Sequence, residues 1–224
     1  MIRDPENKIK KTILSQIKNK NCFALDIGCG NGEVTKFISK NTSLTIGIEP
    51  FFEKLKNLKT DNLYFAANSG SSLCFKDQSF DFVFFCQSLH HIEENSQALA
   101  LKEAERVLKN KGTLLIIEPM YNKGIYGKIT ALINTEKRLK EKANKEIKKL
   151  KNLSFKKLFS KNLKIEFLIN GYNDFFNSKI KDKPGINWNE SIEAKIKNLI
   201  SQAPEKHGKL SIDNHLNVFC FQKD

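Results

Sequence analysis

Residues 24–37 read ALDIGCGNGEVTKF, an apolar run followed by three alternating glycines and a helix-like stretch. The apolar run predicts a short buried strand. Gly28, Gly30 and Gly32 predict a tight turn whose backbone can approach a ligand without intervening Cβ atoms. A helix that begins near Gly32 would direct its N-terminus at the same place. The stretch therefore predicts a ligand site whose chemistry depends on the surrounding residues.

Strand-like and helix-like segments alternate on both sides of this stretch. Strands are expected at residues 22–28, 43–50, 62–68, 80–88 and 113–119, and helices at 5–19, 32–40, 51–58 and 96–112. Asp4 and Pro5 are a suitable cap and first-turn residue for the first helix. Such alternation is typical of an α/β fold with a doubly wound, mostly parallel sheet and helices on both faces.

The pattern changes after Pro119. Residues 125–150 are lysine-rich and carry an apolar stripe at helical spacing, which predicts a helical insertion after the fifth strand. A strand at 163–170, a helix at 191–203 and a last strand at 215–223 complete the pattern. Since 224 residues suffice for one well-buried core, we expect a single domain over 1–224. Its expected parts are an N-terminal helix (1–20), a ligand-binding core (21–120), a helical insertion or lid (121–210) and a final strand (211–224).

The charge of the chain is strongly positive, at +13, which raises the question of a nucleic-acid partner. Only three of the 38 basic residues are arginines, the usual choice for phosphate and base recognition. Lys, Ile, Asn and Phe, all abundant here, share A/T-rich codons. Solvated lysine faces are therefore favoured over a nucleic-acid surface.

The sequence also bears on location and metal binding. It has no run of eighteen apolar residues and no signal-peptide pattern at its start, so we expect a cytoplasmic protein without a membrane span. The five cysteines are widely spaced, without a C-x-x-C pair and without histidines at zinc-ligand spacing. We therefore expect neither disulfides nor a metal site.

Two acidic residues restrict the class of ligand that the glycine turn can bind. The dinucleotide fingerprint is G-x-G-x-x-G, whereas this chain has G-x-G-x-G preceded by Asp26 within the strand. A carboxylate at Asp26 would repel a diphosphate but suits a ligand that carries an ammonium and a sulfonium. Glu49 ends the second strand, where its two oxygens can accept both hydroxyls of a ribose. Together these residues indicate a nucleoside with a cationic, amino-acid-like tail.

Four segments in order carry a resemblance to a known family. Residues 25–32 (LDIGCGNG) resemble the first motif of the class I S-adenosylmethionine-dependent methyltransferases, and Glu49 matches the acid of their second strand. Residues 71–94 (SSLCFKDQSFDFVFFCQSLHHIEE) and 103–119 (EAERVLKNKGTLLIIEP) are similar to later motifs of the small-molecule "LHHI" branch. The resemblance covers roughly residues 20–120. It implies a seven-stranded sheet of order 3-2-1-4-5-7-6, with the last strand antiparallel.

The resemblance implies S-adenosyl-L-methionine as cofactor and S-adenosyl-L-homocysteine as product. The expected reaction is methyl transfer by in-line displacement to a small-molecule acceptor, which is helped mainly by proximity. The family's usual acid after the third strand is absent, and Asn68 or Ser69 would accept the hydrogen bond from adenine more weakly. The expected cofactor contacts are Asp26, Gly28, Cys29, Gly30, Asn31, Glu49, Pro50, Asn68, Ser69, Gly70 and Gln87.

Candidate catalytic groups follow the fourth and fifth strands. His90, His91 and Glu118 lie where an acceptor would approach the methyl group, and each is a candidate for removing an acceptor proton. Six aromatic residues after Pro119 are candidates for an apolar lid over the acceptor or for ordinary core packing. They are Tyr121, Tyr126, Tyr172, Phe175, Phe176 and Trp188.

Two alternative functions stay open at this point. The first is an RNA or tRNA methyltransferase that uses the lysine-rich residues 136–164 as its phosphate surface. The second is a cofactor-binding subunit without activity of its own, since the motifs concern binding rather than turnover. The acceptor and the oligomeric state are not readable from the sequence.

Overall fold

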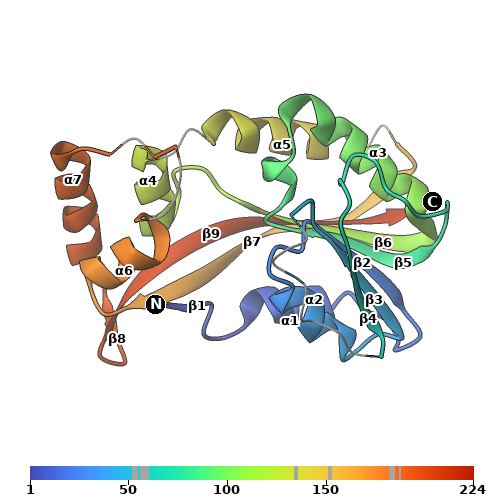
Figure 1. Cartoon of the computed structure of the whole chain (residues 1–224), viewed down its shortest axis with the longest axis horizontal. Helices are drawn as coiled ribbons and strands as arrows, with labels where there is room; N and C mark the ends of the chain where they lie inside the picture. Colours follow the sequence, from blue (N-terminus) through green and yellow to red (C-terminus); the bar gives the residue numbers. More distant parts are fainter. Residues whose placement is uncertain (52–54, 56–60, 134–135, 151–152, 182–184, 187) are drawn as a thin grey trace. The chain divides into compact units, whose positions relative to one another are not determined.

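A computed structural model describes residues 1–51, 55, 61–133, 136–150, 153–181, 185–186 and 188–224 (Figure 1). The described strands are β1 (Ile2–Arg3), β2 (Phe23–Ile27), β3 (Leu44–Ile48), β4 (Leu63–Ala66), β5 (Phe80–Cys86), β6 (Leu108–Pro119), β7 (Phe155–Ile169), β8 (Glu205–Lys206) and β9 (Lys209–Lys223). The described helices are α1 (Lys8–Leu14), α2 (Glu33–Ser39), α3 (Gln97–Val107), α4 (Gly124–Ile133), α5 (Lys137–Lys149), α6 (Tyr172–Lys179) and α7 (Glu190–Ser201). Two short 3-10 turns, η2 (Leu89–His91) and η3 (Glu94–Ser96), precede α3.

The strand order confirms the predicted α/β class. It is β1-β7-β9-β6-β5-β2-β3-β4, with β8 paired to β9. The seven longer strands thus follow the order 3-2-1-4-5-7-6. The predicted count of seven strands was too low, because two-residue strands β1 and β8 bring the described sheet to nine. The antiparallel direction of the final strand stays a prediction.

The central strands are parallel, and β2 and β5 are almost completely buried, as their apolar sequences predict. β2 pairs with β3 and β5, β3 pairs with β4, and β5 pairs with β6, all in parallel. Strands of this kind, covered on both faces, read as nearly continuous apolar runs. Because parallel strands end at the same edge, the residues after β2, β3, β4, β5 and β6 gather there.

The chain divides into two compact units. One comprises residues 1–9, 119–140 and 162–216, and the other comprises 10–118, 141–161 and 217–224. β7 and β9 contribute residues to both units. The predicted single domain with an insertion stays a proposal.

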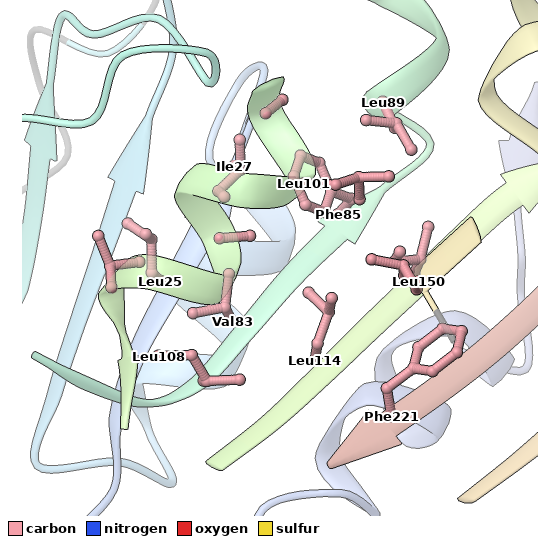
Figure 2. Close-up of a cluster of buried hydrophobic side chains, with 14 of the residues drawn as sticks. Leu25, Ile27, Val83, Phe85, Leu89, Leu101, Leu108, Leu114, Leu150 and Phe221 are labelled. Atoms are coloured by element: carbon pink, nitrogen blue, oxygen red, sulfur yellow. The ribbon is translucent and has the colours of Figure 1, made fainter. Parts of the chain in front are cut away.

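The core of the second unit lies between α3 and one face of the central strands (Figure 2). Leu25, Val83 and Leu114 contribute from three neighbouring strands and are fully buried. The buried face of α3 supplies Ala100, Leu101, Ala104 and Val107 at helical spacing. α2 covers the opposite face of β2, where Thr35 contacts a strand residue. The two helices thus cover both faces, as a doubly wound sheet requires.

Several predicted element bounds were wrong. The helix expected at 96–112 ends at Val107, because residues from Leu108 on join β6 through a bulge in its pairing with β5. The helical insertion expected at 125–150 consists of two helices, α4 and α5. The strand expected at 163–170 begins earlier, at Phe155. α6 was not predicted, and the helix expected at 51–58 falls mostly outside the described residues.

The N-terminal helix is shorter than expected, but Asp4 does cap it. α1 covers Lys8–Leu14 rather than residues 5–19. The Asp4 carboxylate accepts hydrogen bonds from the backbone N–H groups of Lys8, at 3.0 Å, and Ile9, at 2.9 Å. These donors have no partner within the helix, so the acid stabilises the first turn.

Aromatic side chains of the first unit pack on one another. The Tyr126 ring meets Phe167 edge-on at a centroid distance of 4.7 Å and lies 6.3 Å from Phe175, which is buried. A second group joins Phe176 to Tyr172 and Trp188. For Tyr126 and Phe175 this geometry is core packing, the second of the two interpretations raised above. In the described part of the chain, no helix is both long and apolar enough to cross a bilayer.

Candidate functional site

The glycine loop joins β2 to α2 in a conformation that favours glycine. Gly28, Gly30 and Gly32 all have positive φ, at 75°, 58° and 73°. A Cβ on Gly28 would lie 2.6 Å from the Cβ of Ser88, whereas a Cβ on Gly30 would meet nothing within 4 Å. The loop is therefore packed tightly at its first glycine and open at its second.

Asp26 and Glu49 flank this loop. Asp26 is buried, and its Oδ2 accepts a hydrogen bond of 2.7 Å from the Thr35 hydroxyl on α2. The other oxygen, Oδ1, is buried without a partner in the described structure. Burial raises the pKa of Asp26 to about 7, Thr35 opposes this shift, and the charge of Glu49 adds to it. Glu49 Oε2 in turn accepts from the Gly30 N–H at 3.0 Å.

The loop after β4 brings Asn68, Ser69 and Gly70 to the same edge of the sheet. Asn68 Oδ1 is buried and has no hydrogen-bond partner in the described structure, and Ser69 pairs with Ser72 in an isolated bridge. A Cβ on Gly70 would lie 2.9 Å from Ile27 Cγ2. Glycine at this position therefore lets the loop pack directly against the end of β2.

Arg106 holds the continuation of this loop on α3. Its guanidinium donates to the backbone oxygens of Leu73, at 3.0 Å, and Phe75, at 2.8 Å. It also donates to the carboxylates of Glu103 and Asp77. Glu103 accepts a further bond of 2.8 Å from the Leu73 N–H. The planar fork of arginine suits such a set of acceptors, so this network fixes the loop that leads away from Gly70.

His90 and Glu118, two of the candidate catalytic residues, form a buried pair. His90 Nδ1 lies 2.5 Å from Glu118 Oε2, and Glu118 Oε1 accepts from the Leu89 N–H at 3.0 Å. Both carboxylate oxygens thus have partners. The His91 ring is exposed and lies 4.0 Å from the His90 ring.

The other expected contacts lie around the loop ends. Cys29 is buried, and burial raises its thiol pKa, so the thiol is a neutral packing group. Asn31 and Pro50 are exposed. Gln87 follows β5 with a positive φ of 57° and donates its N–H to the Ile117 oxygen at 2.7 Å.

Three residues whose hydrogen bonds stabilise this region were not predicted from the sequence. Thr35 binds Asp26, Ser88 donates its hydroxyl to the Ile27 oxygen at 2.5 Å, and Arg106 fixes the 73–77 loop. Arg106 lies in residues 103–119 and Ser88 in residues 71–94, the two segments that resemble later motifs of the family. Both residues therefore belong to stretches that the sequence already singled out. Thr35 had no signal except its place in the first turn of the helix.

A cavity of about 280 Å³ opens at the other end of the same strands. It is lined by residues at the starts of β2 and β5 and in the first part of β6, among them Cys22, Phe82 and Thr113. Open α/β sheets bind their ligands beyond the carboxyl ends of the strands. We therefore assign the candidate site to the glycine loop rather than to this cavity.

The features of the site and the family comparison concern the same part of the chain. A parallel sheet ends in a glycine-rich loop, a buried acid lies in the first central strand, and a second acid follows the next strand. Residues 25–116 match the family model described as a methyltransferase domain. Over these residues the chain is similar to the class I S-adenosylmethionine-dependent methyltransferases.

Two relatives are similar to about half of the chain, and a solved structure has the same fold. An uncharacterized protein of Methanocaldococcus jannaschii is 36% identical over 107 residues, which are 47% of this chain and 40% of that protein. The ubiquinone/menaquinone biosynthesis C-methyltransferase of Rickettsia massiliae is 31% identical over 123 residues, or 49% of each chain. The chain spans half or less of the length of these relatives. The crystal structure of the YcgJ protein from Bacillus subtilis has the same fold, with a TM-score of 0.66, 17% identity and coverage of 97% of this chain and 98% of that one.

Proposed function

We propose that the chain binds S-adenosylmethionine at the glycine loop and transfers its methyl group to a small-molecule acceptor. The observation that carries this proposal is the buried Asp26 carboxyl, whose Oδ1 lacks a partner in the described structure. A ligand with a cationic amino-acid end supplies what this oxygen lacks. When bound, the cofactor provides a methyl group activated by a positively charged sulfur.

The remaining residues fit the other parts of such a ligand. Glu49 is held beside the loop by the Gly30 N–H and can accept hydrogen bonds from ribose hydroxyls. Open space next to Gly30 leaves room for the ligand at the loop. Asn68 Oδ1, buried without a partner in the described part, is an acceptor for the adenine amine.

We further propose that Glu118 is a positioning residue and His90 the proton acceptor. Both Glu118 oxygens are engaged, one with Leu89 N–H and one with His90 Nδ1. A carboxylate beside Nδ1 selects the tautomer with the proton on that nitrogen, which leaves the Nε2 lone pair available. His91 is exposed beside it and stays a secondary candidate.

The function is tested by incubating the purified chain with methyl-labelled S-adenosylmethionine and a cell extract, with and without ribonuclease. We expect label in the small-molecule fraction. The Rickettsia relative is named for carbon methylation in quinone biosynthesis, so the organic-soluble part is analysed separately. Ribonuclease-sensitive label in large molecules would instead favour an RNA methyltransferase, and cofactor binding without any transfer would favour an inactive subunit.

Some of the lysines on which the RNA alternative depends are paired with acidic side chains. In the segment 136–164, Lys140 pairs with Glu136, and Lys142 and Lys149 pair with Glu146. Such pairs reduce the positive charge available to phosphate. We therefore keep RNA as an outcome of the test rather than as a second proposal.

Glu49→Ala tests the cofactor site directly. We expect cofactor binding to weaken by roughly 1–3 kcal/mol, because ribose hydroxyls lose their acceptors. Glu33→Ala is the matched control, since Glu33 is an exposed acid at the start of α2 that pairs with Lys10. Titration calorimetry that gives wild-type affinity for Glu49→Ala would remove Glu49 from the site.

A further inference from the structure

Asp26 is buried with too few hydrogen-bond donors for a carboxylate. Only 1% of the residue is exposed. The Thr35 hydroxyl donates to Oδ2, and Oδ1 has no partner in the described structure. An ionised carboxylate offers about four lone-pair sites, and burying such a charge without compensation is costly. The geometry therefore favours the neutral acid when no ligand is present.

The groups packed against Asp26 do not compensate its charge. α2 contributes the neutral Thr35 hydroxyl, and β5 contributes Phe84 at the paired position. The loop contributes Cys29, whose thiol is held neutral by burial and by the nearby acids. After β3 stands Glu49, a second acid whose charge opposes ionisation of Asp26. Burial, the larger effect, acts in the same direction and brings the pKa of Asp26 to about 7.

We propose that Asp26 releases its proton to solvent when the cofactor binds, so that binding is coupled to the loss of up to one proton. This inference rests on the proposed function. The ammonium of the ligand's amino-acid end supplies a positive charge, which none of the described groups named above places beside Asp26. Below pH 7 most of the ligand-free protein thus holds a neutral acid, whereas the complex holds a carboxylate paired with the ligand.

The coupling has a calculable size. With a pKa of about 7, half of the ligand-free molecules carry the proton at pH 7, so about half a proton is released on binding. Affinity then rises with pH, and it is roughly 25-fold weaker at pH 5.5 than at pH 7.5 if the bound acid is fully ionised. The affinity depends on pH because the protonated fraction of the protein must lose the proton of Asp26 before it can pair with the ligand.

Titration calorimetry measures this coupling without knowledge of the acceptor. S-adenosylhomocysteine and S-adenosylmethionine are titrated into the purified chain at pH 5.5, 6.5, 7.0 and 7.5. Each titration is repeated in two buffers with different ionisation enthalpies, and the difference in observed heat gives the number of protons exchanged. We expect release of about half a proton at pH 7 and close to one at pH 5.5.

Two variants assign the proton to Asp26. Asp26→Asn is neutral at every pH, so it should bind more weakly than the wild type at pH 7.5, with no proton release and a flat pH profile. Thr35→Val removes the hydroxyl that stabilises the charged form, so its proton release should persist to higher pH. Thr35→Val keeps the test decisive if Asp26→Asn binds too weakly to titrate.

The outcomes separate this inference from the function on which it rests. Absence of binding for both ligands would reject the cofactor site itself. Binding by the wild type without proton release between pH 5.5 and 7.5 would overturn the coupling and leave the site intact. Equal proton release by wild type and Asp26→Asn would also overturn it, because the proton would then come from another group.

Discussion

We expect the free energy of unfolding of Asp26→Asn, measured without ligand and relative to that of the wild type, to increase as the pH rises. The carboxyl has an ordinary pKa of 3.8, which burial raises to about 7 in the folded protein. Between these values the folded state binds more protons than the unfolded state, so the stability of the wild type falls as pH rises through this window. The loss is nearly complete at about pH 8, one unit above the folded pKa. Asparagine does not titrate, so the variant escapes this loss.

The magnitude follows from the shift of about three units. At about 1.4 kcal/mol per unit, the wild type loses about 4 kcal/mol of unfolding free energy between pH 4 and pH 8 through Asp26 alone. An asparagine amide without a partner at the Oδ1 position costs about 1–3 kcal/mol at every pH. The stability difference between variant and wild type should therefore grow by about 4 kcal/mol over this range, whatever its starting value.

Urea unfolding of both proteins at pH 4, 5, 6, 7 and 8, without ligand, measures this difference. All other titrating groups are shared by the two proteins, so they cancel in the comparison. A difference that stays constant within 1 kcal/mol from pH 4 to pH 8 would refute the reasoning. Asp26 would then be ionised in the folded protein with a nearly ordinary pKa.

Three further substitutions test other parts of the site. Gly28→Ala should lower the unfolding free energy by about 2–4 kcal/mol in urea titrations, because the positive φ of Gly28 and the close Ser88 Cβ both oppose a side chain. Gly30→Ala is the control at an open position, and it should lower the unfolding free energy by only about 1 kcal/mol. Arg106→Met should cost about 2–4 kcal/mol in the same assay by leaving Glu103 and two loop carbonyls without their donor, and an unchanged midpoint would contradict that role. Glu118→Gln should reduce methyl transfer about 100-fold or more, because the amide no longer selects the His90 tautomer. The affinity for the cofactor should stay unchanged. If this affinity falls as much as the rate of methyl transfer, Glu118 has a structural role only.

The parallel core of the fold was predictable because its strands are short apolar runs separated by clear turn signals. β2, β3, β4 and β5 were each located from sequence within a few residues. β7 was predicted too short, because lysines and exposed residues occupy its first half, outside its pairing with β1, and hide the alternation of a strand. α6 was missed because its eight residues present only one fully buried side chain, Phe175.

The candidate site was predictable residue by residue but not as a set of contacts. Glycines and acids at the ends of strands carry a recognisable spacing, so Gly28, Asp26 and Glu49 could be named in advance. His90 and Glu118 were named separately, yet 28 residues separate them in sequence. Only the pairing of β5 with β6 brings these two together, and only the packing of α2 on β2 brings Thr35 to Asp26.

The core shown in Figure 2 sets limits on how the protein can be dissected. Leu25 and Leu114, within the family match at residues 25–116, share that core with Leu150 and Phe221, which lie far outside it. A fragment cut at the limits of the match would expose apolar surface that these later residues normally cover, and we expect it to aggregate. The unit recognised by sequence comparison is therefore smaller than the unit that folds, and fragments for expression should retain residues 141–161 and 217–224.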